Sequence, residues 1–393
     1  MSIITQLYKN VGLLDSIFPY YQQLPSVFHK IVAKEFAKKA SREIENHPLP
    51  NHLVFFVTNK CNLQCSHCFY IDELNSKTRE LDIDEIKKIA SSLKGNISQL
   101  MLTGGEAFLR ADLADIVKVF EQFAGIKSVN MLTSGFFPKK IEKTVQKIIN
   151  ETSLALYFQI SIDGIKQKHD LIRKNSESFD NAMQTIETLQ RLRAQHSSRI
   201  DRISTLTTLG KPNYNDIEKI VNELSPLKKV NLGFGFARST FNDIYGEFDK
   251  EKLSSYEPND EDVFLTVEQM KESYQRIDRS LWSKSKASLH YSENKAILRN
   301  LIRLKETNYQ SSFKCMAGVT DFILYPNGDV ALCEMFQPFG NLKKYDFNVQ
   351  KFWGKEYETY KKTVLGCKCT HSCNVASMIK YDKNELYDIF SQQ

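Results

Sequence analysis

The sequence predicts an α/β fold in which parallel strands are covered by helices and a small module follows near the C-terminus. Two observations lead to this prediction. Six strand-like segments alternate with helical segments between residues 53 and 305, and an Asn-Gly pair at 327–328 joins two further short strands. Parallel neighbours need crossover connections such as helices, whereas two strands around an Asn-Gly turn indicate a hairpin. An incomplete barrel and a doubly wound sheet both satisfy this pattern.

The six strand-helix units follow one another in a regular order. Apolar and β-branched runs predict strands at residues 53–58, 97–103, 128–134, 154–162, 202–209 and 230–237. Apolar residues at helical spacing predict helices at residues 82–94, 112–124, from 138, 179–196, 214–224 and within 262–305. Ligands of parallel sheets bind at the carboxyl ends of the strands, so the functional residues are expected there.

Composition limits the class of protein. The chain has 393 residues, of which 41% are hydrophobic, and can form one large domain and a smaller one. Its net charge of +6 is spread thinly, which gives no argument for nucleic acid or an anionic membrane as a partner. No apolar run approaches the roughly 20 residues that cross a bilayer, and no signal-peptide pattern opens the chain. We therefore expect a cytoplasmic protein.

These patterns divide the chain into four parts. Helical periodicity predicts a helical N-terminal extension at residues 1–50, and the strand-helix core covers residues 51–240. A loop and helices at residues 241–309 complete the core, and a cysteine-bearing module covers residues 310–393. The stretch 238–260 has no clear period, and loops of that length are more often functional than idle.

Three cysteines, Cys61, Cys65 and Cys68, lie in eight positions just after the first strand. In a reducing compartment, thiols are more often metal ligands than disulfide partners. A zinc site normally has four ligands, and His67, the candidate fourth, is adjacent to Cys68, from which its side chain diverges in most backbones. A four-iron four-sulfur cluster normally takes four cysteines, so three leave one iron open to an outside ligand. The spacing therefore favours a cluster that takes part in chemistry.

This C-x3-C-x2-C spacing resembles the signature of the radical S-adenosylmethionine (SAM) superfamily, which implies a partial (β/α)6 TIM-like barrel and SAM bound at the open iron. Gly104, Gly105 and Glu106 in "LTGGE" resemble the family's Gly-Gly-Glu motif, which lines the methionine part of SAM and hydrogen-bonds its amino group. A side chain at either glycine would obstruct close backbone approach. An ordinary strand-to-helix turn is the alternative, but the position beside the cysteine loop favours the motif.

Further matches follow in the expected order. Ser134 in "LTSG" resembles a polar position near SAM, and Ser161 and Asp163 in "ISIDG" resemble residues that hold its ribose hydroxyls and carboxylate. Arg173 in "HDLIR" resembles the partner of the SAM carboxylate, a pairing that suits guanidinium geometry. A solvated arginine at a helix start is the alternative, since most arginines are exposed.

The resemblance also has departures. Glu177 stands where relatives commonly have glycine before Ser-Phe, so we expect a different local turn. His67 occupies a usually aromatic position before the third cysteine, where the family uses backbone atoms and a stacked ring against adenine. We expect Phe69 and Tyr70 to share that role.

The second cysteine group consists of Cys315 and Cys333 around the hairpin and of Cys367, Cys369 and Cys373 in "GCKCTHSC". This arrangement resembles the SPASM and twitch auxiliary-cluster domains of radical SAM enzymes. Five cysteines are too few for two clusters, so one auxiliary 4Fe-4S cluster is expected. Cys315, Cys333 and Cys373 are the first candidates, with Cys367 and Cys369 competing for the remaining place, and a zinc module is the alternative.

The resemblance implies an enzyme whose first cluster passes an electron to SAM, which breaks into methionine and a 5′-deoxyadenosyl radical that abstracts hydrogen from the substrate. It also implies an electron donor such as flavodoxin or ferredoxin, and a peptide or small-molecule substrate. The favoured interpretation is modification of a ribosomally made natural-product peptide by crosslinking, thioether formation or epimerisation.

Two alternatives stay open. Residues 1–50 are too short and too helical for the winged-helix leader-binding domain of many peptide-modifying relatives, which favours a small metabolite such as a sugar, aminoglycoside or amino acid. A non-enzymatic zinc or iron-sulfur binding protein is the rival from another class, but it does not explain "LTGGE" and "ISIDG" at successive strand ends.

Overall fold

The computed structural model describes most of the chain. The described residues are 24–45, 49–239, 244–245, 247–255, 257–259, 261–285, 288–307, 315–364 and 367–391. None of the helices in this part of the chain combines the length and the apolar character that crossing a bilayer requires.

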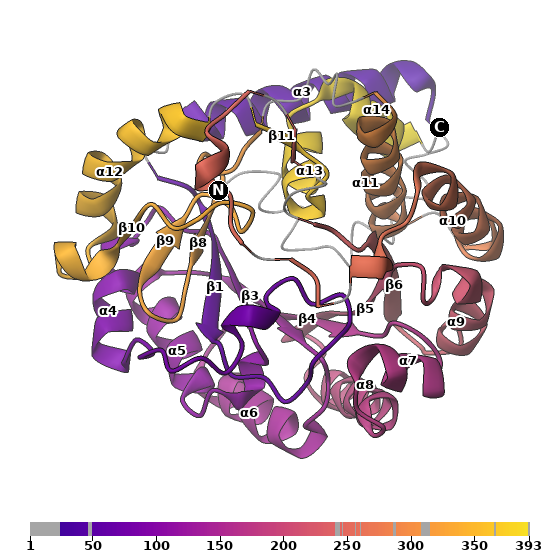
Figure 1. The fold of residues 1–393 in the computed structure, drawn as a ribbon, viewed down its shortest axis with the longest axis horizontal. Helices are drawn as coiled ribbons and strands as arrows, with labels where there is room; N and C mark the ends of the chain where they lie inside the picture. Colours follow the sequence, from indigo (N-terminus) through magenta and orange to yellow (C-terminus); the bar gives the residue numbers. More distant parts are fainter. Residues whose placement is uncertain are drawn as a thin grey trace.

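A nine-stranded sheet forms the centre of the molecule, in the order β10-β9-β8-β1-β2-β3-β4-β5-β6 (Figure 1). Its strands are β1 (His52–Thr58), β2 (Gln99–Gly104), β3 (Ser128–Thr133), β4 (Ala155–Ser161), β5 (Ile200–Leu209), β6 (Val230–Phe236), β8 (Asp321–Leu324), β9 (Asp329–Ala331) and β10 (Gly340–Asn341). Strands β1 to β6 pair in parallel with their sequence neighbours. In the described residues the two edge strands do not pair with each other, so the sheet stays open. The predicted α/β fold with an incomplete barrel is confirmed.

Helices cover the outer face of the parallel strands (Figure 1). They are α4 (Ile83–Ser92), α5 (Leu113–Val119), α6 (Pro138–Glu151), α7 (Gln167–Arg173), α8 (Ser178–Gln195), α9 (Ile217–Leu224), α10 (Val267–Ser280) and α11 (Leu289–Glu306). Alternate strand residues, such as Phe55 on β1 and Phe158 on β4, are fully buried under them. The helix expected at residues 112–124 is α5 followed by a π-helical turn, Phe120–Ala124, which ends at Gly125 with φ +79°.

The predicted hairpin is present as β8 and β9, which pair antiparallel. It does not stand apart as a separate layer, because β8 also pairs in parallel with β1, with Leu53 opposite Phe322 and Phe55 opposite Leu324. Phe322 and Leu324 are fully buried in the same core as β1. The hairpin therefore extends the central sheet on the side of the cysteine loop.

The segment after β6 pairs with residues of the C-terminal part of the chain. Its two-residue strand β7 (Ile244–Tyr245) pairs antiparallel with β11 (Lys368–Cys369), and Leu253 forms a bridge with Phe336. Three more helices, α12 (Val349–Val364), α13 (Ser372–Ile379) and α14 (Lys383–Ser391), complete the C-terminal part.

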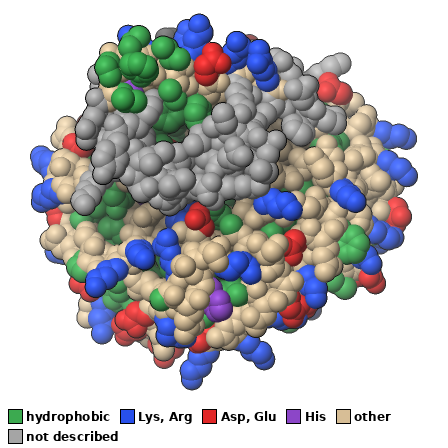
Figure 2. Space-filling model, turned by 180° about the vertical axis from the view of Figure 1, so that it is seen from behind, with side chains coloured by type: hydrophobic (Ala, Val, Ile, Leu, Met, Phe, Trp, Pro, Cys, Tyr) green, Lys and Arg blue, Asp and Glu red, His purple; other side chains and the backbone are tan. Residues whose placement is uncertain are grey.

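The N-terminal extension is helical where the structure describes it. Helix α3 (Ser26–Glu45) packs on α14, with the rings of Phe36 and Phe390 5.2 Å apart. Residues 1–23 and 46–48 lie outside the described residues. Exposed hydrophobic side chains belong mainly to the start of α3, and Figure 2 shows hydrophobic side chains gathered at the upper edge of the molecule, where Figure 1 places this helix.

Candidate active site

The cysteine loop leaves the carboxyl end of β1 and is held from several directions. The backbone N–H of Cys61 donates to Asn75 Oδ1 at 3.1 Å, and Asn75 Nδ2 donates back to the Cys61 carbonyl at 3.0 Å. On the other side, the N–H of Ser66 donates to the carbonyl of Ile172 on α7 at 2.9 Å. The loop is thus attached both to the segment that follows it and to the helix after β4.

The three thiols of this loop are largely shielded from water. Burial, with smaller contributions from neighbouring thiols, raises the pKa of Cys61 to about 12 and that of Cys68 to about 11. Burial also raises the pKa of Cys65. Metal ligation requires the thiolate form. Because burial withholds the water that would stabilise this charged form, a bound cation would have to stabilise it instead. All three thiols lie on the one loop between β1 and the segment around Asn75, as the spacing predicts.

The spacing of the side chains bears on the kind of group they could hold. Among the residues that the structure describes, no three His, Cys, Asp or Glu side chains lie close enough together to hold a single metal ion. A four-iron cluster takes each thiolate on a different iron, so its ligands stand further apart than the ligands of one zinc ion. Cysteine thiols are the ligands that iron-sulfur clusters take, so the donor set of this loop fits such a cluster.

Gly104 and Gly105 allow the end of β2 to lie against the cysteine loop. A Cβ at Gly104, where φ is +135°, would lie 2.2 Å from the Thr58 carbonyl oxygen, and one at Gly105 would lie 2.2 Å from that of Lys60. The N–H of Gly105 donates to the Thr58 carbonyl at 2.9 Å. The close approach expected at these glycines is present, and its partner here is the backbone that leads into Cys61.

Glu106 is buried, with only 2% of its surface exposed, and its carboxylate is fully hydrogen-bonded. Oε1 accepts from the N–H of Phe108 at 3.1 Å and from Thr133 Oγ1 at 2.8 Å. Oε2 accepts from the N–H of Ser134 at 2.8 Å and from Ser134 Oγ at 2.6 Å. Because a carboxylate offers about four acceptor sites, an amine could join only if one donor turned away. The rotatable hydroxyl of Ser134 is the simplest donor to release.

Asp163 and Arg173 form a buried ion pair beside the cysteine loop. Asp163 is fully buried and also accepts from the N–H of Thr208 at 2.9 Å, while His67 Nε2 lies 3.6 Å from Asp163 Oδ2. Burial alone would raise the pKa of Asp163, but Arg173 and the histidines hold it below its usual value. Arg173 Nη1 also donates to Cys65 Sγ at 3.5 Å. The alternative of a solvated Arg173 is wrong, since this side chain is only 9% exposed.

Two histidines line this ion pair in their neutral form. Burial lowers the pKa of His67 to about 4 and that of His169 to about 3. His169 Nδ1 accepts from the N–H of Asp163 at 3.0 Å, so its Nε2 carries the proton and donates to Ser178 Oγ at 3.1 Å. His169 therefore fixes the backbone at the end of β4, a role that we did not predict, although the His-Asp-x-x-Arg pattern marks its position.

The remaining residues predicted for SAM lie in different surroundings. Tyr70 is buried against Phe56, with 5.1 Å between the ring centres, and stacks on Tyr325 of the hairpin at 6.2 Å. Ser161 is half-buried at the carboxyl end of β4. Roles for Tyr70 and Phe69 against adenine, and for Ser161 at the ribose, stay predictions.

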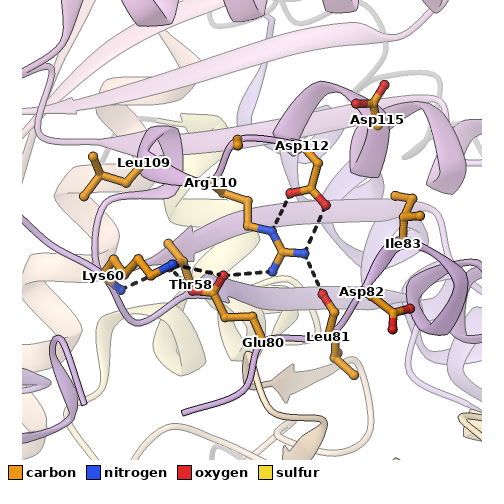
Figure 3. Close-up of a pocket in the computed structure, with 11 residues that line it drawn as sticks. Thr58, Lys60, Glu80, Leu81, Asp82, Ile83, Leu109, Arg110, Asp112 and Asp115 are labelled. Carbon is orange, nitrogen blue, oxygen red and sulfur yellow. Dashed lines mark hydrogen bonds and ion pairs between the residues drawn. The ribbon is translucent and has the colours of Figure 1, made fainter. Parts of the chain in front are cut away.

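Arg110 is a site residue that the sequence analysis missed. It is 8% exposed and donates to the Val57 carbonyl at 2.9 Å. It also donates to the Leu81 carbonyl at 2.6 Å and to Asp112 Oδ1 at 2.6 Å (Figure 3). Its Nη1 lies 3.5 Å from Glu80 Oε2. Arg110, Glu80, Leu81 and Asp112 line a pocket of about 610 Å³ together with Thr58 and Lys60, which lead into the cysteine loop. Arg110 thus fixes the end of β1 from outside, and only its position shortly after Glu106 could have pointed to it.

The second cysteine group also comes together. Burial raises the pKa of Cys315 to about 12, and burial with the neighbouring Cys369, Cys315 and Cys333 raises that of Cys367. Cys333 and Cys369 are buried in one small apolar cluster that Cys367 packs against. We expected Cys367 and Cys369 to compete for one place, whereas both lie with Cys315 and Cys333. The side chain of Cys373, on α13, lies outside the described residues.

Comparison with known proteins finds a family model that matches part of the chain. Residues 55–224 match the model of the radical SAM superfamily. This segment, which is less than half of the chain, is similar to the radical SAM superfamily. The match covers the first cysteine group, the Gly-Gly-Glu motif and the Asp163–Arg173 pair, and it confirms the predicted enzyme class.

Several curated proteins are similar to part of this chain. AlbA of Bacillus subtilis, an antilisterial bacteriocin subtilosin biosynthesis protein, is 29% identical over 43% of this chain and 38% of its own length. Fe-coproporphyrin III synthase of Methanosarcina barkeri is 27% identical over 47% of this chain and 46% of its own length. The matched segment spans less than half of these relatives.

Several solved structures share the fold over a larger part of the chain. SuiB of Streptococcus suis, bound to S-adenosylmethionine, has a TM-score of 0.54 at 14% identity, over 82% of this chain and 71% of its own. The anSMEcpe structure with bound AdoMet and the Kp18Cys peptide has a TM-score of 0.56 at 15% identity, over 88% of this chain and 100% of its own. At this identity the likeness concerns the fold alone.

Proposed function

We propose that this protein binds a 4Fe-4S cluster through Cys61, Cys65 and Cys68, binds SAM beside it, and abstracts a hydrogen atom from its substrate. The observation that carries the proposal is the meeting of the buried thiol of Cys65, the half-buried thiols of Cys61 and Cys68, a buried carboxylate and a buried arginine at the carboxyl ends of parallel strands. When bound, such a cluster supplies the electron that cleaves SAM, and the cleaved cofactor removes the hydrogen atom.

The residues of the chain have separate parts in this proposal. Glu106 Oε2 accepts from the amino group of SAM once the Ser134 hydroxyl, which donates to this oxygen in the structure, turns away and leaves it free. Arg173 presents a buried guanidinium that can pair with the SAM carboxylate, because a guanidinium suits planar anions. The neutral His169 holds the backbone of Asp163 in place. The buried walls keep water from the reacting atoms.

We further propose one auxiliary 4Fe-4S cluster at the second cysteine group. Cys315, Cys333, Cys367 and Cys369 supply four thiols, the number that such a cluster takes. Their mutual proximity supports this choice, and Cys373 stays a candidate from the sequence. A flavodoxin or ferredoxin is the proposed electron donor, in the cytoplasm.

The proposed substrate is a ribosomally made peptide. The names of two relatives support it: AlbA belongs to subtilosin biosynthesis, and SkfB of Bacillus subtilis, 28% identical over 44% of this chain, is a maturation protein for the sporulation killing factor. A small metabolite is the second candidate, and the match to Fe-coproporphyrin III synthase favours it.

Anaerobic reconstitution tests the proposal. The protein is loaded with iron and sulfide, reduced with dithionite and incubated with SAM, and we expect 5′-deoxyadenosine and methionine to form. Alanine at Cys65 should abolish this cleavage, whereas alanine at Cys333 should leave it intact in the absence of substrate. A wild-type protein that binds zinc instead of iron, or that leaves SAM uncleaved, would refute the proposal. Deuterium transfer to 5′-deoxyadenosine from a labelled precursor peptide or a labelled metabolite then decides the substrate class.

A further inference from the structure

Arg238 lies just after β6, the last of the parallel strands. Its guanidinium stacks over the Phe69 ring, with Cζ 4.3 Å from the ring centre, and pairs with the Glu334 carboxylate. Phe69 follows Cys68 directly in the chain, and Glu334 follows Cys333 directly. One side chain therefore touches the immediate neighbour of a cysteine in each of the two groups.

Glu334 also contacts the end of the second cysteine group. His371 Nε2 lies 2.5 Å from Glu334 Oε1, and His371 follows Cys369 by two residues. The side chains of Arg238 and Glu334 are 18% and 9% exposed. An ion pair and a cation–π contact are both stronger where water is largely excluded, so these contacts hold their partners firmly.

The open sheet explains why such a connection matters. In the described residues, β6 is one edge of the sheet, and no backbone ladder joins it to β1 or β9. The cysteine loop follows β1, and Cys333 follows β9, while Arg238 comes from the opposite edge. Arg238, which follows the edge strand β6, contacts Phe69 of the cysteine loop and Glu334 next to Cys333.

We propose that Arg238 is a positioning residue that fixes the two cysteine groups relative to each other. The proposal rests on the proposed function for the identity of the two clusters, whereas the connection itself is made by the chain. A guanidinium suits it because its flat face stacks on a ring while its edge donates to a carboxylate. Lysine keeps the charge but has no flat face, so Arg238→Lys should restore the connection only in part.

Hydrogen exchange on the full-length chain without iron tests the connection directly. We expect Arg238→Met to raise exchange in residues 62–70 and in residues 329–336 together, by about tenfold each, because both lose the same partner. Arg238→Lys should fall between that variant and the wild type. The matched control is Arg276→Met, which removes another partly buried arginine, the partner of Glu218. An increase in only one segment, in neither, or equally in the control would overturn the proposal.

A second measurement uses the loaded protein. Pulsed EPR of the two reduced clusters should give a narrow distribution of spin–spin distances in the wild type and a broader one in Arg238→Met, at unchanged iron content. An unchanged distribution would overturn the proposal. Failure of the proposed function has a different signature, since the wild type would then bind no iron or leave SAM intact, while the exchange result would still decide the role of Arg238.

Discussion

Arg173 Nη1 donates to Cys65 Sγ at 3.5 Å while its Nη2 pairs with Asp163. One arginine thus connects the cysteine loop after β1 with the strand end after β4. Asp163 is fully buried, and the pair lies where the resemblance predicts the SAM carboxylate. A ligand carboxylate that binds Arg173 would therefore share the guanidinium with Asp163.

The first prediction concerns this ion pair. Arg173→Gln should lower the free energy of unfolding by about 3–5 kcal/mol, because it leaves the buried Asp163 charge unpaired. Asp163→Asn introduced together with Arg173→Gln should recover part of that loss, so the double variant should be at least about 0.5 kcal/mol more stable than additivity predicts. Urea unfolding of the wild type, both single variants and the double variant measures the coupling. Strict additivity would show that the two side chains act independently.

The second prediction concerns Gly105. Gly105→Ala places a Cβ 2.2 Å from the Lys60 carbonyl oxygen, so the backbone that leads into Cys61 has to shift. We expect the purified protein to lose most of the iron of the first site, measured by iron content and by SAM cleavage. Gly354→Ala is the matched control, because no atom lies within 4 Å of its added Cβ. That control should keep its iron, and equal losses in both variants would contradict the steric argument.

The third prediction concerns Arg110. Arg110→Met should lower the free energy of unfolding by about 3–5 kcal/mol, because two backbone carbonyls and the Glu80 and Asp112 carboxylates lose a buried partner. Lys147→Met removes an exposed ion pair with Asp115 in the same region and should cost about 0–1 kcal/mol. Thermal or urea unfolding compares the two variants. Similar small losses in both would mean that Arg110 does not fix the strand end.

The sequence predicts those parts of the fold that local patterns determine. The strands β1 to β6 and their helices have clear periodicity, and the Gly-Gly-Glu motif lies at a strand end that this periodicity defines. The parallel pairing of β8 with β1 could not be foreseen, because it joins segments that are far apart in the chain. The two-residue strands β7 and β11 are too short to carry any period.

The two arginines that support the site, Arg110 and Arg238, also could not be predicted from the sequence. Arg110 and Arg238 belong to no motif that we recognised, and Arg110 binds backbone carbonyls, which any residue could provide. Their roles depend on which distant segments the fold brings next to them. By contrast, the proximity of Cys61, Cys65 and Cys68 follows from their spacing on one loop, so the sequence was enough to predict it.

The fourth prediction concerns Cys367 and Cys369. The sequence predicts that they compete for one place, because a single residue separates them, but both thiols lie with Cys315 and Cys333. Cys367→Ala and Cys369→Ala should therefore each lower the iron content by about four atoms per chain, since a cluster that loses one of four thiolates is no longer held. SAM cleavage without substrate should persist in both variants, because the first cysteine group is untouched. If only one of the two substitutions lowers the iron content, the competition is real and the other thiol is not a ligand.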